Sequence, residues 1–378
     1  MKLPRIQLYY KILLSVFVVV TVITYLSAYL SYQKGKADME VADRQVFLRI
    51  TVATAKEANK VFMIGRTLTQ SIATHSDVRS FMAGNKGVSA ENRILDYFRN
   101  FSIGNTFPAL YLVDKDGLCI LSTDESFVGH NFGFRNYFTH AIKGGAGVDA
   151  GVGVVSRRMG YYFSYPIYSL DGSTIIGVVV AKMEPKIVHE VLDNGDFGYK
   201  TNVMLTNDNG VILHSTKAER VFWSLAPLTE EQMAFEQSTR FIDRVIEPLT
   251  YPKAAHEVAS YVSPVIFDFF DERDNEDETV SVAKVGDTPF YIITETESNL
   301  LSGHIFNQAT QIIIFVGGGI VLAMILISIL LYVYLLPLSI IRKSLLRMAV
   351  RERVNIPKIR TGDELEEIND SLQKIVNR

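Results

Sequence analysis

Two basic residues stand where they could bind an anion. Arg135 lies in FGFRNYFTHAIKGG, residues 132–145, among aromatic rings. Lys182 ends the apolar run GVVVAK, where an unpaired buried ammonium would be costly, so it reaches solvent or meets an anion. Because a guanidinium can hold a carboxylate through two parallel hydrogen bonds, the chemistry that these residues predict is carboxylate binding.

The segment around Arg135 predicts a short helix. Its core-facing stripe would comprise four apolar residues at helical spacing, namely Phe134, Phe138, Ala141 and Ile142. Arg135 and Tyr137 lie off that stripe near the helix start, where free backbone N–H groups and the helix dipole favour an anion. Each cation also has a structural interpretation, in which Arg135 pairs with a carboxylate such as Asp149 and Lys182 extends to solvent from a strand end.

No catalytic chemistry is predicted. The candidate residues include no nucleophile–base pair and no metal-ligand cluster, so the sequence predicts no catalytic residue, metal or cofactor. The histidines are scattered and are expected on the surface or in the core: His130, His140, His189 and His214. The only cysteine, Cys119, is expected to be an inert buried strand residue.

An internal repeat predicts two similar units. ALYLVDKDGLCILST, residues 109–123, aligns without a gap to NVMLTNDNGVILHST, residues 202–216. Each contains an Asp/Asn-rich turn between two alternating apolar runs, which indicates a β-hairpin. A second strand pair follows each hairpin, as YYFSYPIYS with IIGVVVAKM and as VSVAKVGD with PFYIITETE. We expect two tandem α+β units with antiparallel sheets, and a solvated loop for the acidic run at 268–279.

The ends of the chain predict a membrane protein. Residues 12–33 and 311–336 each exceed the ~20 apolar residues that cross a bilayer, and the first is too long for a cleaved signal peptide. Basic residues before the first span and after the second place both termini in the cytoplasm. Residues 36–82 have a helical period and would form a stalk of roughly 60 Å. The net charge of −3 does not favour nucleic-acid binding.

Beyond the second span, Pro337 precedes an amphipathic run, an extended connector, and Asp363 and Glu364 at the start of a second amphipathic run. The apolar spacing in that run comes from Leu365, Ile368, Leu372 and Ile375. This pattern resembles the HAMP signalling domain, which implies a parallel four-helix coiled coil across a homodimer. The family's usual glycine is Glu366 here, and an ordinary pair of juxtamembrane helices is the alternative.

Residues 131–186 resemble the double Cache sensor domain, most closely that of the periplasmic C4-dicarboxylate sensor histidine kinases. The resemblance rests on a series of motifs in this order: FRNYF, a glycine-rich gap, S-x-x-x-GYYFSYP and GVVVAK. The resemblance implies PAS-like sheets, with the ligand in the membrane-distal unit. Carried onto this sequence, it implies ligand-binding residues Arg135, Tyr137, Ser156 and Lys182, with Tyr162 as a further candidate.

One departure bears on the ligand. Amino-acid-binding Cache domains carry an aspartate on the last strand for the ligand's ammonium, whereas this chain has Lys182. Two cations suit a dicarboxylate such as succinate, malate or fumarate and disfavour a zwitterion, while a monocarboxylate or another anion is the alternative. The second unit has no counterpart of FRNYF, which is consistent with its binding nothing.

The predicted organisation is an α+β receptor in the cytoplasmic (inner) membrane. Its parts are a cytoplasmic N-terminus at 1–11, a transmembrane helix at 12–33, a stalk and connection at 34–98, a distal Cache subdomain at 99–196, a proximal one at 197–308, a transmembrane helix at 311–336 and a HAMP domain at 337–378. The stalk and HAMP would pair in a homodimer.

Such a receptor would sense a small carboxylate in the periplasm or outside the cell. It would relay the signal to a cytoplasmic kinase, cyclic-dinucleotide enzyme, phosphatase or chemotaxis module absent from this chain. The alternatives are a stand-alone receptor that signals through a separate partner protein, and an extracytoplasmic enzyme anchored by two helices.

Overall fold

The computed structural model describes residues 8–102, 106–195, 200–249, 264–271, 275–298, 304–350, 356–362 and 364–376. These belong to two compact units, one formed by Met1–Met39 with Gly303–Arg378 and the other by Glu40–Ser302. The second unit holds every strand and the candidate ligand-binding residues. It is therefore the unit that decides what the protein can bind.

Helix α1, Leu8–Thr74, is continuous over 67 residues, and α2, Ser76–Met82, follows after a single break. The break falls at His75, whose Nδ1 accepts a hydrogen bond from the Asp77 N–H at 3.3 Å and so caps α2. Helix α3, Val88–Arg99, completes the helical segment. The helix expected over 36–82 is confirmed, apart from this break.

The first sheet contains five antiparallel strands in the order β2-β1-β5-β4-β3. The strands are β1 Ala109–Asp114, β2 Cys119–Ser122, β3 Gly147–Val152, β4 Met159–Tyr168 and β5 Ile175–Met183. Between them lie η2 Glu125–Phe127 and α4 Asn136–Ala141, and α5 Pro185–Asp193 follows. The predicted hairpin and strand pair are confirmed, and Cys119 is buried in β2, where burial raises the pKa of its thiol to about 12.

Strand β3 was not predicted, because its sequence is rich in glycine. A Cβ on Gly147 would lie 2.2 Å from Ser164 Oγ and 2.6 Å from the Tyr137 carbonyl oxygen. A Cβ on Gly151 would lie 2.7 Å from the Arg240 carbonyl oxygen. The glycines therefore mark a strand against which other segments pack at backbone distance, rather than a loop.

The second sheet repeats this arrangement, with strand order β10-β11-β12-β6-β7. The strands are β6 Thr201–Thr206, β7 Ile212–Ser215, β10 Val265–Asp271, β11 Glu276–Lys284 and β12 Tyr291–Glu297. Shorter elements connect them: η3 Ala218–Arg220, β8 Trp223–Ser224, α6 Glu230–Phe235, η4 Glu236–Arg240 and β9 Glu247–Pro248.

The expected solvated loop at 268–279 is wrong. The run forms the end of β10 and the start of β11, and residues 272–274 lie outside the described residues. Asp268 pairs with Thr279 in the ladder and accepts a hydrogen bond from its hydroxyl at 2.8 Å, while Arg44 of α1 forms an ion pair with Asp268. These partners offset the low strand propensity of aspartate.

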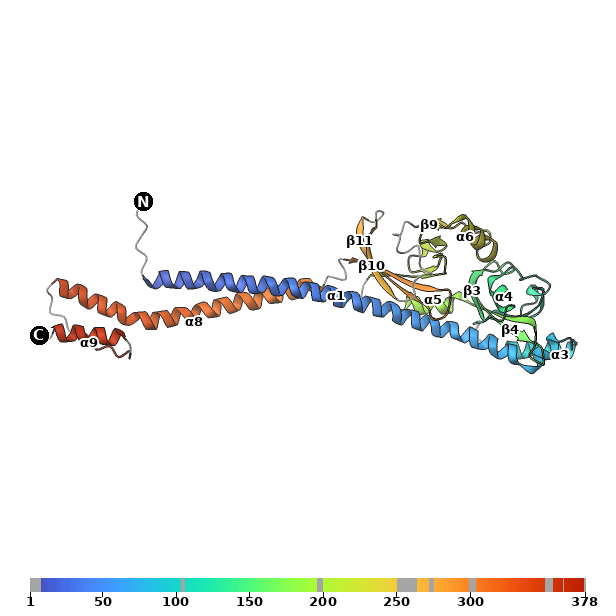
Figure 1. Cartoon of the computed structure of the whole chain (residues 1–378), viewed down its shortest axis with the longest axis horizontal. Helices are drawn as coiled ribbons and strands as arrows, with labels where there is room; N and C mark the ends of the chain where they lie inside the picture. Colours follow the sequence, from blue (N-terminus) through green and yellow to red (C-terminus); the bar gives the residue numbers. More distant parts are fainter. Residues whose placement is uncertain are drawn as a thin grey trace. The chain divides into compact units, whose positions relative to one another are not determined.

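The core lies between α1 and both sheets, which sit along the same side of this helix (Figure 1). Phe62 of α1 is fully buried and contacts both sheets. Its ring centroid is 5.2 Å from that of Tyr161 and 5.0 Å from that of Phe290. A second cluster covers the opposite face of the first sheet and includes Tyr111, Phe127 and Phe132. We call the subdomain around the first sheet distal and that around the second proximal.

The other unit contains α8, His304–Ala349, and α9, Glu364–Val376. Among the described residues, two helices are long and apolar enough to cross a membrane, over Tyr10–Thr74 and Ile314–Ala349, as expected. Helix α8 continues through Pro337. The connector before α9 is fastened to it by hydrogen bonds from Asn369 to the Pro357 carbonyl oxygen and from Gln373 to the Ile356 carbonyl oxygen. Asp363 lies outside the described residues, and HAMP assembly stays a prediction.

Candidate functional site

Arg135 is buried at the start of α4. It is the N-cap residue, only 3% exposed, and its guanidinium donates hydrogen bonds to the carbonyl oxygens of Val152, at 2.7 Å, and Thr239. The expected core stripe is partly wrong, because α4 begins at Asn136 and Phe134 precedes it, 41% exposed. The Phe134 ring instead lies 5.1 Å from the guanidinium carbon of Arg135, within cation–π range.

Tyr137 takes the buried position on α4. Its ring stacks on that of Tyr162 from β4, with centroids 5.1 Å apart and planes 11° apart. The Tyr137 hydroxyl lies 2.9 Å from that of Tyr111. Burial raises the pKa of Tyr137 to about 12, against the lowering effect of Arg135, so the phenol is neutral and can donate a hydrogen bond. The two stacked rings lie close enough to Arg135 for its charge to oppose the rise in the pKa of both phenols.

Lys182 of β5 is buried on the same face of the sheet as Tyr162, its cross-strand neighbour on β4. It is 4% exposed, and its Nζ donates a hydrogen bond to Ser156 Oγ at 2.6 Å and lies 6.0 Å from the Tyr162 ring centroid. Burial lowers the pKa of Lys182; Glu184 opposes this, and Arg158 and Arg135 add to it. The prediction that Lys182 could extend to solvent is therefore wrong.

Ser156 and Tyr162 meet at Gly153. A Cβ there would lie 2.5 Å from Ser156 Oγ and 2.9 Å from the Tyr162 hydroxyl. This hydroxyl is buried and has no hydrogen-bond partner among the described residues. Since buried polar atoms are nearly always hydrogen-bonded, it is an available donor or acceptor at this place. The structure thus gathers Ser156, Tyr162 and Lys182, with Tyr137 and Arg135 adjoining through the stacked rings.

Arg135 and Lys182 differ from the other buried basic residues in their partners. Among the residues that the structure describes, no ion pair involves Arg135 or Lys182. The alternative pairing of Arg135 with Asp149 is wrong, because Asp149 Oδ1 accepts from Arg240 Nε at 2.8 Å. A buried cation with no counter-ion among the described residues is a candidate for binding an anion.

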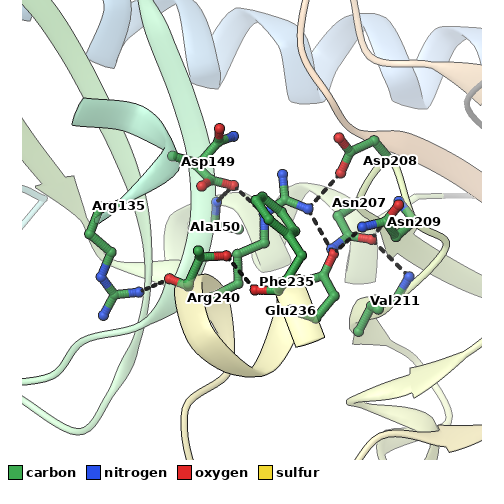
Figure 2. Close-up of polar contacts among 12 residues, drawn as sticks. Arg135, Asp149, Ala150, Asn207, Asp208, Asn209, Val211, Phe235, Glu236 and Arg240 are labelled. Atoms are coloured by element: carbon green, nitrogen blue, oxygen red, sulfur yellow. Dashed lines mark hydrogen bonds and ion pairs between the residues drawn. The ribbon is translucent and has the colours of Figure 1, made fainter. Parts of the chain in front are cut away.

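A second buried arginine, Arg240, was missed by sequence reasoning. It is 1% exposed and pairs with Asp149 of the distal subdomain at 2.8 Å, Asp208 at 2.6 Å and Glu236 at 2.8 Å (Figure 2). Burial raises the pKa of Asp149, and Arg240 is the largest influence that lowers it. The only local signal was the i,i+4 spacing of Glu236 and Arg240, which an exposed helix would also show.

The η4 segment connects this cluster to the candidate site. Thr239, whose carbonyl oxygen accepts a hydrogen bond from Arg135, immediately precedes Arg240 in the sequence. One short segment of the proximal subdomain therefore contacts both the candidate ligand-binding arginine and β3 of the distal sheet. Both subdomains contribute to the surroundings of Arg135.

The described residues thus form a long helix that packs against two five-stranded antiparallel sheets of the same strand order. The profile of the Cache domain family matches residues 43–305, well over half of the chain. The chain belongs to the Cache domain family. Its sensor domain is like that of the C4-dicarboxylate sensor proteins, as the following relatives show.

Two curated relatives carry the same name, C4-dicarboxylate transport sensor protein DctB. The protein of Rhizobium meliloti is 28% identical over 152 residues, 38% of this chain and 23% of the relative. That of Pseudomonas aeruginosa is 31% identical over 125 residues, 32% of this chain and 19% of the relative. Each alignment spans less than a quarter of the relative's length.

A solved structure shows the same fold. The crystal structure of the sensor domain of the V. cholerae histidine kinase DctB superposes with a TM-score of 0.54 at 21% identity. The match covers 71% of this chain and 98% of that one. The expected Cache architecture is confirmed, whereas the dicarboxylate ligand and the cytoplasmic output stay predictions.

Proposed function

We propose that this chain is the sensory part of a transmembrane receptor that binds a small dicarboxylate in the distal subdomain. The observation that carries the proposal is the burial of Arg135 and Lys182 without a carboxylate partner in the described structure. An uncompensated buried charge is costly, and a ligand with two carboxylates would neutralise both cations. The names of the two curated relatives support this ligand class.

Each candidate residue has a distinct role in this proposal. The Arg135 fork would hold one carboxylate through two hydrogen bonds, with the Tyr137 hydroxyl beside it. Lys182 and Ser156 would hold the other, and the Tyr162 hydroxyl, which is buried without a partner among the described residues, would donate to an oxygen. A zwitterionic amino acid fits poorly, because its ammonium would lie beside Lys182 with no acceptor.

The contact between Arg135 and Thr239 suggests how binding would be reported. A carboxylate that binds the guanidinium competes with the Thr239 carbonyl oxygen for its N–H groups, and Thr239 belongs to the proximal subdomain. Ligand binding would therefore alter the contacts between η4 and the distal subdomain. This change would then be passed to α1 and to the predicted HAMP segment as a change in their packing. The size of this effect is limited by the difference in ligand affinity between the two states.

The test is a thermal-shift assay on the full chain in detergent, with succinate, malate, fumarate, acetate and L-alanine. A dicarboxylate at a hundred times its dissociation constant should stabilise the protein by about 2.7 kcal/mol. Arg135→Ala should abolish this shift. Arg157→Ala, which removes an exposed arginine paired with Asp243 at 2.8 Å, should retain it.

The ligand-induced shift is the deciding quantity. Arg135→Ala also removes hydrogen bonds to two carbonyl oxygens, so a loss of about 1–3 kcal/mol in the unliganded protein is expected and is not evidence on ligand binding. Stabilisation by L-alanine with none by the dicarboxylates would contradict the role given to Lys182. An undiminished succinate shift in Arg135→Ala would contradict the site.

A further inference from the structure

The two sheets carry opposite charges at matching positions. The sequence repeat aligns Ala109 with Asn202, and the ladders pair Ala109 with Lys182 and Asn202 with Glu295. Glu295 of β12 therefore occupies in the proximal sheet the position that Lys182 of β5 occupies in the distal one. The proximal subdomain has a carboxylate where the distal subdomain has an ammonium.

A polar cavity of about 520 Å³ surrounds this position in the proximal subdomain. Asn202, Glu278 and Glu295 line it from three adjacent strands, β6, β11 and β12. Glu278 is 4% exposed and Asn202 is 5% exposed, although both side chains line a cavity. We call it the proximal cavity.

Two of its buried polar atoms lack partners. Glu278 Oε2 and Asn202 Nδ2 have no hydrogen-bond partner among the described residues. The orientation of the Asn202 amide follows from its Oδ1, which accepts a hydrogen bond from the Lys217 backbone N–H at 3.3 Å and also from Ser215 Oγ and Thr216 Oγ1. The proximal cavity therefore offers an unpaired hydrogen-bond acceptor, Glu278 Oε2, and an unpaired donor, Asn202 Nδ2, among the described residues. Buried atoms of this kind are rarely left unsatisfied.

The other carboxylate is already engaged. Arg220 Nη1 donates to both oxygens of Glu295 at 2.9 Å, and Lys217 Nζ lies 3.4 Å from Oε1. Glu278 has no such partner in the described part of the chain, and burial raises the pKa of its carboxyl, with Lys217 as the largest opposing influence. A ligand cation would thus find its acceptor at Glu278 rather than at Glu295.

The charges of the lining residues indicate the sign of the ligand. Four glutamates line the proximal cavity against two lysines, Lys200 and Lys217. Within the described residues, no three metal-binding side chains are placed to hold a metal ion. An organic cation fits these conditions, because its ammonium can share one carboxylate while the rest of the molecule fills the volume.

We propose that the proximal cavity binds a small primary amine that carries an oxygen acceptor. Its ammonium would donate to Glu278 Oε2, and its oxygen would accept from Asn202 Nδ2. The two ligands of the chain would then have opposite charge, a dicarboxylate in the distal subdomain and an amine in the proximal one. The amine site does not depend on the distal site, since no residue belongs to both.

Ethanolamine, serinol and glycinamide are suitable probes, tested by thermal shift and isothermal titration calorimetry on the full chain in detergent. At least one should raise the melting midpoint of the wild-type protein and of Arg135→Ala, in which the distal site is removed. Glu278→Gln should reduce the affinity for that probe at least tenfold. Asp277→Asn, which removes an exposed carboxylate from the same strand outside the proximal cavity, should leave the affinity unchanged.

Choline supplies a test that needs no variant. It has the charge and hydroxyl of ethanolamine but no N–H to donate to Glu278, so it should bind at least tenfold more weakly than ethanolamine. The proposal is overturned if none of the three probes binds the wild-type protein, or if choline and ethanolamine bind equally. It is also overturned if Glu278→Gln lowers the affinity less than tenfold, or if binding disappears in Arg135→Ala.

Discussion

Burial and charge pairing separate two kinds of basic residue in this protein. Arg240 and Lys182 are both buried, yet Arg240 contacts three carboxylates while the hydrogen bond of Lys182 goes to the hydroxyl of Ser156. The charge of Arg240 is already compensated by carboxylates, whereas Lys182 would gain from an anion. For this reason we place the proposed anion site at Lys182 and Arg135 and not at Arg240.

The same contrast explains what could be predicted at single residues. Lys182 was identifiable from sequence because a lysine interrupts an otherwise apolar strand. Arg240 was not, because its partners Asp149 and Asp208 lie 91 and 32 residues away in the sequence. A charge whose partners are distant in the chain looks like any exposed charge until the fold is known.

His189 of α5 predicts a dependence of stability on pH. Its Nε2 lies 3.1 Å from the Tyr161 hydroxyl, and its ring stacks on that of His214 with centroids 4.0 Å apart. Burial lowers the pKa of His189 to about 3, with a further lowering by His214 and an opposing effect of Asp193. The unfolded chain takes up this proton near pH 6.5, whereas the folded protein does not until about pH 3.

The free energy of unfolding therefore decreases as the pH falls from about 6.5 towards 3, by at most about 1.4 kcal/mol per pH unit. His189→Gln keeps a hydrogen-bonding side chain beside Tyr161 without the titration. Between pH 7 and pH 5, its melting midpoint should fall less than that of the wild-type protein. His130→Gln, at an exposed position, should behave as wild type. Equal slopes for all three proteins would show that His189 does not titrate as described.

At the scale of elements, the short η4 segment joins the two subdomains. Arg240 supplies the only positive charge in a buried group with Asp149, Glu236 and the half-buried Asp208, counting ion pairs of the described residues (Figure 2). Asn207 and Asn209 add hydrogen bonds to Glu236 Oε1 at 3.0 and 2.6 Å. The segment is thereby bound to β3 through Asp149 and to the proximal sheet's β6–β7 turn through Asn207, Asp208 and Asn209.

Arg240→Met should break this junction. It leaves buried carboxylates without their cation, for which a loss of about 3–5 kcal/mol in the free energy of unfolding is expected. Thermal melting of the full chain measures it. Arg244→Met, an exposed arginine of the same connection, should cost little. A loss below about 1 kcal/mol in Arg240→Met would mean that the carboxylates are protonated or reach water once the arginine is removed.

The elements that could be predicted are those with a strong local pattern. Both hairpins and both following strand pairs were visible as alternating apolar residues around a turn. Strands β3 and β10 were not, since glycine and aspartate are unfavourable in strands and are accommodated here by close packing and cross-strand pairing. Tertiary contacts, rather than the local sequence, therefore determine that these two segments form strands.

For the whole molecule, the sequence was most informative about order along the chain. Apolar spans, a long helix and a repeated α+β unit follow from composition and periodicity, and the Cache match agrees with them. Dimerisation and orientation in the membrane depend on contacts between chains and with lipid, which one chain does not determine. They remain predictions, and α1 provides a way to test the first.

Helix α1 exposes a continuous face along its sheet-bearing part. Met63 and Ile64 are exposed there, beside an apolar groove of about 740 Å³ that Phe101 and Phe107 also line. If the receptor is a homodimer through its stalk, this face is where a second copy would pack. Ile64→Cys should then form an intermolecular disulfide in membranes, whereas Asp287→Cys, at a fully exposed turn, should not.

Succinate should change the yield of this disulfide if the stalk carries the signal. Because α1 is one uninterrupted helix from Leu8 to Thr74, a shift at its sheet-bearing part would be passed along its length. Cysteines placed singly along residues 36–64, in a Cys119→Ser background, would give a cross-linking profile with and without succinate. If succinate alters the profile of proteins that keep Arg135 but not that of proteins with Arg135→Ala, the distal site is linked to the stalk. Identical profiles in both would mean that the signal, if any, leaves the sensor by another route.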